Sequence, residues 1–110
     1  MAQTITQVKN SASVVQIAVG RYLDTGTVAA YTFTTGFRPL YVKVQNLAST
    51  GATLEWYHGM ADASAWKSVT AGDGSLITTL GITPLSYGFI FGLDTDTNVT
   101  SEQVSWLAIG

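Results

Sequence analysis

The chain contains no cysteine and very few charged residues. Without cysteine, neither a disulfide framework nor a thiolate metal site can form, and nothing indicates an oxidising compartment. Charged residues make up 11% of the sequence, against about 25% in ordinary soluble domains. The five Lys and Arg residues are scattered and the formal net charge is −2. Because no basic stripe is available for phosphates, we do not expect nucleic-acid binding.

Long hydrophobic runs and histidine are also scarce. No stretch approaches the roughly 18 apolar residues of a membrane-spanning helix, and the N-terminal residues lack a leader pattern, so we expect neither a membrane nor an export role. His58 is the only histidine. Although Asp62 and Ser64 follow it closely, a catalytic triad is defined by geometry, and we expect His58 at the rim of a sheet. No pattern indicates a nucleophile with its base, so we predict no enzymatic activity and no cofactor.

The segment 94–98, DTDTN, resembles the first half of a calcium-binding loop, because carboxylate or amide side chains stand at its first, third and fifth positions. The second half departs from that pattern. Val99 stands where the loop needs a glycine, and Ser105 stands where it needs a glutamate. We therefore predict a solvated turn at this segment and no metal site.

What the chain does contain is alternation of apolar and polar residues, most clearly between Arg38 and Gly59. Both halves of this stretch have period two and are separated by a glycine-containing loop, which predicts an antiparallel hairpin. A single pairing register of the two strands places apolar residues opposite one another on one face and polar or aromatic residues opposite one another on the other face. It gives two inner pairs, Val42 with Trp56 and Val44 with Leu54, and two outer pairs, Tyr41 with Tyr57 and Lys43 with Glu55. The last of these is expected to be a cross-strand charge pair.

Other segments with strand patterns lie between turns rich in Gly, Asp and Pro. Residues 13–20 are apolar on both faces and predict an interior strand. Residues 75–80 predict a short strand followed by a turn, and residues 87–93 predict another, in which Gly88 and Gly92 let a backbone or a tryptophan ring approach closely. Residues 103–109 predict the last strand. Between Gly59 and residue 75 we expect an excursion with about one helical turn. Its anchor is Trp66, which we expect to plug one end of the core, with stacking on a ligand as the alternative.

These segments predict an all-β fold: a single-domain antiparallel β-sandwich of about eight short strands, jelly-roll-like or immunoglobulin-like, with a small closed barrel as the alternative. Residues 13–110 would form the sandwich domain and residues 1–12 an extended N-terminal arm. The arm holds only Ile5 and Val8 as sizeable apolar residues, too few to bury by themselves. We expect it either to lie on a neighbouring subunit or to fold back on its own domain.

Low charge combined with 46% hydrophobic residues favours association, so we expect a homo-oligomeric subunit of an assembly. The outer tyrosines suit either a protein contact or a platform for a sugar, and a neutral sheet face favours the protein contact. The residues expected to bind partners are Ile5, Val8, Tyr41, Lys43, Glu55, Tyr57 and Trp66.

Several short motifs lie between Gly36 and Ile109: GFRP at 36–39, VKVQN at 42–46, EW at 55–56, GMA at 59–61, GIT at 81–83, GF at 88–89, and Trp106 near the end. This pattern resembles small virion structural proteins of tailed bacteriophages, encoded near the major capsid protein. The resemblance implies a non-enzymatic β-sandwich that decorates or cements the capsid by binding the major capsid protein lattice. It also implies oligomers, often trimers.

The same resemblance implies a location in the virion, after assembly in the cytoplasm of a bacterial host. The alternative is a phage fibre or knob module, or a carbohydrate-binding adhesin. Such a protein should show exposed aromatic residues clustered at loop tips, and only in this case would a glycan be the partner.

Overall fold

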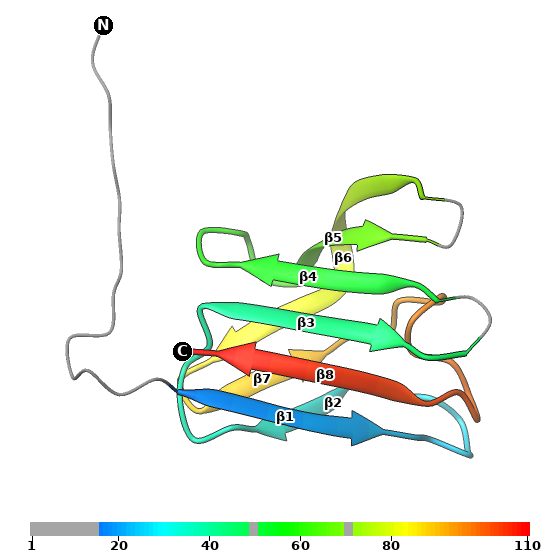
Figure 1. Cartoon of the computed structure of the whole chain (residues 1–110), viewed down its shortest axis with the longest axis horizontal. Coiled ribbons are helices and arrows are strands. Elements are labelled where there is room, and N and C mark those ends of the chain that lie inside the picture. Colours follow the sequence, from blue (N-terminus) through cyan, green and yellow to red (C-terminus); the bar gives the residue numbers. More distant parts are fainter. Residues whose placement is uncertain (1–15, 49–50, 70–71) are drawn as a thin grey trace, which may run out of the picture.

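The computed structural model describes residues 16–48, 51–69 and 72–110, which form eight β-strands and no helix (Figure 1). All neighbouring strands pair antiparallel. The predicted all-β class and the predicted number of strands are confirmed. The strands are β1 Ile17–Tyr22, β2 Tyr31–Thr34, β3 Tyr41–Asn46, β4 Thr53–Tyr57, β5 Ser64–Ser68, β6 Gly74–Leu85, β7 Gly88–Phe91 and β8 Val104–Ile109.

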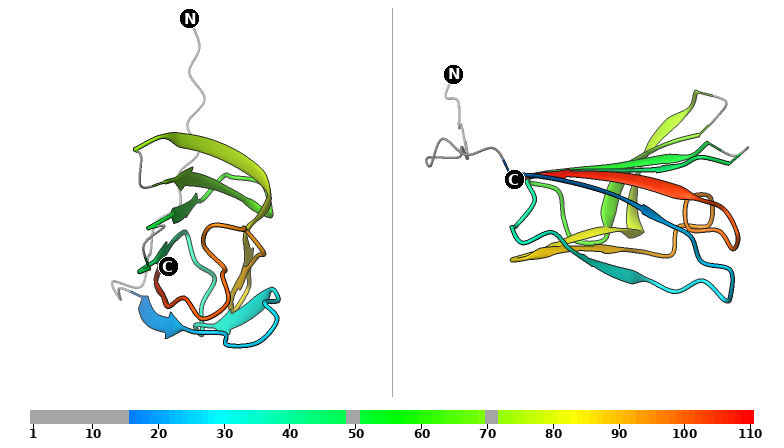
Figure 2. Two further views of the ribbon diagram at one scale, coloured as in Figure 1. Left: turned by 90° about the vertical axis from the view of Figure 1, so that its right-hand side faces the viewer. Right: turned by 60° about the horizontal axis from the view of Figure 1, so that its bottom comes forward.

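The strands form one continuous sheet in the order β1-β8-β3-β4-β5-β6-β7-β2. The sheet curls, so that a layer containing β1, β8, β3 and β4 lies against a layer containing β6, β7 and β2 (Figure 2). The two layers expected of a sandwich are therefore halves of one hydrogen-bonded sheet. The pairing of β1 with β8 and of β2 with β7 is the pairing found in jelly rolls, whereas β3 to β7 follow one another as a meander.

A bend in β6 carries the chain from one layer to the other. The beginning of β6 pairs with β5 and its end pairs with β7. Between these parts the register shifts: Ala65 lies opposite Ile77, but Ser64 lies opposite Ile82. Leu80, inside the shifted part, has a φ of 62°. Irregularities of this kind bend a strand, and residues 75–85 are thus one bent strand rather than the predicted short strand and turn.

The hairpin of β3 and β4 has the predicted register at all four pairs. Successive side chains of a strand point to opposite faces, and here the inner set is completely enclosed. Val42, Val44 and Leu54 are 0% exposed and Trp56 is 3% exposed. The predicted inner face of the hairpin is confirmed as the centre of the core.

Aromatic rings fill the space between the two layers. Phe33, Phe89 and Trp106, from β2, β7 and β8, have ring centroids between 5.0 and 5.3 Å apart. Tyr22 of β1 contacts Tyr31 and Phe33 of β2 at 5.4 and 5.7 Å. Because β1 and β2 lie at opposite ends of the strand order and share no ladder, ring packing joins the two ends of the sheet.

Three further expectations are wrong. The strand β1 is an edge strand and not an interior one: Ile17 and Val19 are 57% and 71% exposed, and residues 13–15 lie outside the described residues. The segment expected to hold a helical turn contains β5 instead. There Trp66 pairs with Glu55 and Leu76 on the side away from the core and is 43% exposed, so it does not plug the core.

The sequence predicts that Gly88 and Gly92 let either a backbone or a tryptophan ring approach closely. The structure confirms the first of these two possibilities. A Cβ on Gly88 would collide with the carbonyl oxygen of Phe33, and a Cβ on Gly92 would lie 2.5 Å from the carbonyl oxygen of Leu80. No tryptophan ring fills this space. The ring of Trp106 packs against Gly20 instead.

Replacing Gly88 by alanine is expected to destabilise the protein by about 2 to 3 kcal/mol, because backbone on the neighbouring strand cannot move away from the added methyl group. Urea unfolding of the purified protein measures the change. Gly26→Ala is the matched control, since its Cβ would meet nothing closer than 3.6 Å, and its expected change is within about 0.5 kcal/mol. Equal stability of the two variants would contradict the packing described for β2 and β7.

Candidate functional site

The side of the sheet that faces away from the core carries three rows of side chains, defined by residues directly opposite one another on successive strands. The first row is Ile17, Ile109, Tyr41 and Tyr57. The middle row is Val19, Leu107, Lys43, Glu55, Trp66 and Leu76. The third row is Arg21, Ser105, Gln45, Thr53, Ser68 and Gly74. We call these three rows the outer face.

The first two rows are mainly apolar, and much of their surface is open to solvent. Ile17, Val19, Tyr57, Trp66 and Leu76 are all among the exposed large hydrophobic residues. They come from strands at both ends of the layer and form one surface only because the ladders place them side by side. Contiguous apolar surface of this kind marks an interaction site in a folded protein, and the outer face is therefore the candidate functional site.

Two tyrosines and a glutamate form a hydrogen-bonded group on this face. The hydroxyl of Tyr41 donates to Oε2 of Glu55 at 2.6 Å, and the hydroxyl of Tyr57 donates to the same oxygen at 3.2 Å. The two rings pack with centroids 5.2 Å apart. Burial, assisted by the hydrogen bond to Glu55, raises the pKa of Tyr41. The negative charge of Glu55 is the main cause that raises the pKa of Tyr57, so both phenols act as donors at neutral pH.

The expected charge pair between Lys43 and Glu55 does not form, although the two residues lie directly opposite each other. Within the described ranges the ion pairs within 4.0 Å all involve Lys67. Phenolic donors, rather than the ammonium of Lys43, bind one carboxylate oxygen of Glu55. Lys43 and Glu55 thus present separate charges of opposite sign at the centre of the outer face.

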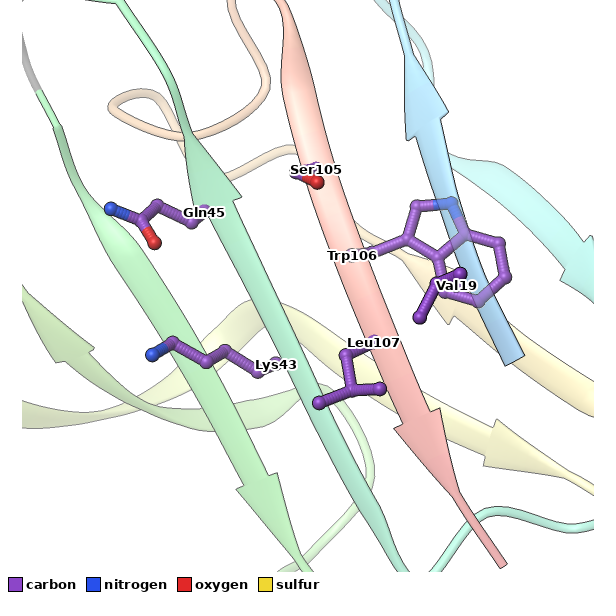
Figure 3. A pocket seen from close by; sticks show the side chains of 6 residues that line it. All are labelled: Val19, Lys43, Gln45, Ser105, Trp106 and Leu107. Atoms are coloured by element: carbon purple, nitrogen blue, oxygen red, sulfur yellow. The ribbon is translucent and has the colours of Figure 1, made fainter. Parts of the chain in front are cut away.

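A shallow depression of about 270 Å³ lies at the other half of the face, over β1, β8 and β3 (Figure 3). Its lining is half apolar, with Val19, Trp106 and Leu107, and half polar, with Lys43, Gln45 and Ser105. Trp106 belongs to the inner side of β8, and its indole packs between the two layers against Phe33 and Phe89.

The loop after β7 contains a buried polar cluster, so the prediction of a solvated turn is wrong for three of the five residues 94–98. Asp94, Thr97 and Asn98 are all buried. The ammonium of Lys67 lies 2.9 Å from Oδ1 of Asp94 and 2.7 Å from Oδ2 of Asp96. Oδ2 of Asp94 accepts a hydrogen bond from Thr97. A lysine ammonium therefore supplies the positive charge that the alternating aspartates need.

The charge state of this cluster follows from its contacts. Burial by itself would lower the pKa of Lys67, but hydrogen bonds to Asp96 and Asp94 outweigh burial and the pKa is raised. No group of three or more His, Asp or Glu in the described part of the chain is arranged to hold a metal ion. Ser64 is buried on β5, whereas His58 and Asp62 are exposed in the turn after β4, so these three residues do not form a common buried site.

The structure brings together five of the seven residues expected to bind partners. Tyr41, Lys43, Glu55, Tyr57 and Trp66 all belong to the outer face, whereas Ile5 and Val8 lie outside the described residues. The aliphatic members of the face were not among the residues expected to bind partners: Ile17, Val19, Leu76, Leu107 and Ile109. Their alternation was visible, but alternation alone does not tell which face of a strand is covered.

Comparisons with known proteins find no match to this chain among family models, curated proteins or solved structures. Over the described ranges no helix is long and apolar enough to span a membrane. The resemblance to phage virion proteins therefore stays a prediction, and the outer face is the structural feature that bears on function.

Removing the ammonium of Lys67 is expected to cost about 3 kcal/mol of unfolding free energy, because Lys67→Met leaves Asp94 buried without its cation. Lys43→Met is the matched control on the outer face, with an expected change within about 0.5 kcal/mol. Urea unfolding at neutral pH measures both. Since the folded pKa of Lys67 is raised above its ordinary value of 10.5, its contribution is complete below that pH and disappears as the pH rises further. Similar stabilities of the two variants would contradict the buried pair.

Neutralising Glu55 is expected to lower the pKa of both Tyr41 and Tyr57 towards the ordinary value of 10.0, because the charge and the acceptor that disfavour phenolate are weakened. NMR titration of the tyrosine ring carbons in Glu55→Gln measures each pKa separately. Asp62→Asn, which removes an equal charge from an exposed turn, should leave both values unchanged. Unchanged tyrosine titration in Glu55→Gln would rule out the hydrogen-bonded group.

Proposed function

We propose that this protein is a non-enzymatic structural subunit that acts by burying its outer face against other proteins in an assembly. The observation that carries the proposal is the pair of apolar rows that cross up to six strands and are exposed in the single chain. A chain with 11% charged residues has little charge to keep such a face apart from other molecules. Burial of the outer face in an assembly removes its apolar side chains from contact with water.

The assembly we propose is the virion of a tailed bacteriophage, formed in the cytoplasm of the host bacterium. The motif resemblance supports this choice, with the major capsid protein lattice and further copies of the chain as partners. A capsid decoration protein needs a rigid body with a broad contact surface. The aromatic and apolar residues of the outer face are those expected in the core of a protein interface, and Lys43 and Glu55 are two charges that a partner has to match.

The alternative is a fibre or knob module, or an adhesin that binds carbohydrate on Tyr41, Tyr57 and Trp66. For an adhesin we expect exposed aromatic residues at loop tips. In the part of the chain that the structure describes, Tyr31, Tyr57 and Trp66 lie on strands, and Tyr87 is the exposed aromatic residue that lies in a turn. This distribution supports a sheet-face protein contact over a sugar site.

Phage particles assembled with Tyr57→Ser in place of the native protein are expected to carry at least about tenfold fewer copies, because a central aromatic contact is lost. Quantitative mass spectrometry of gradient-purified particles, relative to the major capsid protein, measures the copy number. Tyr87→Ser is the control, because Tyr87 is 51% exposed and Tyr57 46% exposed, but Tyr87 lies outside the outer face.

Any of three results would contradict the proposal. The first is that particles contain none of the native protein. The second is that particles carry as many copies of Tyr57→Ser as of Tyr87→Ser, and the third is that soluble glycans shift the NMR signals of Tyr41 and Tyr57. The last result would support the adhesin instead. A native copy number far below that of the major capsid protein would indicate a fibre or tail position.

A further inference from the structure

We infer that the partner of the outer face is a second copy of this chain, bound face to face about a two-fold axis. The inference rests on the proposed function, because it specifies which protein covers the face, and it goes beyond it by predicting a dimer without any capsid. It is carried by the order of side chains along the middle row, by the shape of the face and by its area.

The middle row has the same character read from either end. It runs Val19, Leu107, Lys43, Glu55, Trp66, Leu76, which is two apolar residues, a cation, an anion and two apolar residues. Its midpoint lies between β3 and β4. A row with this order matches its own reversed copy, and self-matching is the requirement for an isologous two-fold interface.

The axis that achieves this match runs parallel to the strands, between β3 and β4. Rotation about it reverses the order of the strands but keeps each row opposite itself. Lys43 then faces Glu55 of the second copy, and Leu107 faces Trp66 of the second copy. In the first row Tyr41 faces Tyr57 of the second copy. An axis perpendicular to the strands would instead place Lys43 against Lys43 and the apolar first row against the polar third row, so it gives no match.

The same rotation matches the shape of the two halves of the face. On one half Trp66 is 43% exposed and its ring leans over Gly74, where a Cβ would lie 2.7 Å from the ring. On the other half is the depression over β1, β8 and β3, with Leu107 and Val19 in its lining (Figure 3). Because Leu107 lies opposite Trp66 of the second copy, each depression receives one indole.

The area is sufficient for a specific dimer. The outer face has sixteen positions, and with strands about 4.8 Å apart and rows about 6.8 Å apart two copies bury about 1,000 Å² in total. That value is about the minimum for a specific interface. The twist of stacked sheets rotates the rows by about 30°, and the central pairs of Lys43 and Glu55 lie nearest the axis and are displaced least.

Charge reversal tests the central pairs. Lys43→Glu and Glu55→Lys each place like charges opposite one another twice in the dimer, and each is expected to raise the dimer dissociation constant at least about tenfold. An equimolar mixture of the two variants restores both opposite-charge pairs and is expected to form one-to-one heterodimers. Sedimentation velocity and native mass spectrometry of the full chain measure the masses.

A charge-matched mixture is the control for non-specific attraction. Asp62→Lys has the same net charge as Glu55→Lys, but it lies in the exposed turn after β4, outside the central pairs. It should form far less heterodimer with Lys43→Glu, because one of the two central pairs then places Glu against Glu. Circular dichroism and thermal melting establish that each variant is folded. As a second measurement, Leu76→Ser is expected to weaken the wild-type dimer by about tenfold to a hundredfold. Leu47→Ser, equally exposed but outside the outer face, should not weaken it.

A monomeric wild-type protein at every concentration, or equal heterodimer formation by Asp62→Lys and Glu55→Lys, would overturn the inference. So would equal dimerisation of the Leu76 and Leu47 variants. These results are distinct from failure of the proposed function. If the wild type is monomeric but particles still carry fewer copies of Tyr57→Ser than of the native protein, the outer face is a contact surface whose partner is another protein.

Discussion

The structure depends on one constraint: a sheet has two faces, and in residues 16–48, 51–69 and 72–110, which contain no helix, only strands can cover them. Here the sheet curls until its inner face is enclosed, with Val42, Val44, Leu54, Phe89 and Phe91 fully buried. The bend in β6 and the ring contacts between β1 and β2 make the curl possible. The cost is an outer face that nothing in the described part of the chain covers, and that face is the surface available for assembly.

Carboxylates are satisfied in two different ways, and the difference separates structure from interaction. Asp94 is buried and takes an ammonium from Lys67, because a buried charge needs a full opposite charge nearby. Glu55 lies on the outer face and takes phenolic hydroxyls from Tyr41 and Tyr57. Neutral donors stabilise the carboxylate but do not cancel its charge. Its charge and that of Lys43 therefore stay available for an approaching molecule.

Local features were predictable, and long-range ones were not. The hairpin register followed from two adjacent strands joined by a short loop, and residues 104, 106 and 108 share the inner side of β8, as alternation implied. The exposure of Ile17 and Val19 did not follow, because β1 pairs with β8, which lies at the other end of the sequence. The burial of the loop at Asp94 depends in the same way on Lys67, a residue from a distant strand. Trp66 was assigned to the core because large aromatic residues are usually buried, but the register of β5 places it on the outer side.

By itself the sequence determined the all-β class, the positions of most strands, the hairpin and the set of side chains that alternate together. These properties are local, because pleating gives every strand a period of two whatever its neighbours are. Only the tertiary structure decided which alternating set is covered and which is left outside. That choice depends on strand order and on the direction in which the sheet curls. It joins Val19, Leu107, Lys43, Glu55, Trp66 and Leu76 into one row, although they are spread over almost the whole chain.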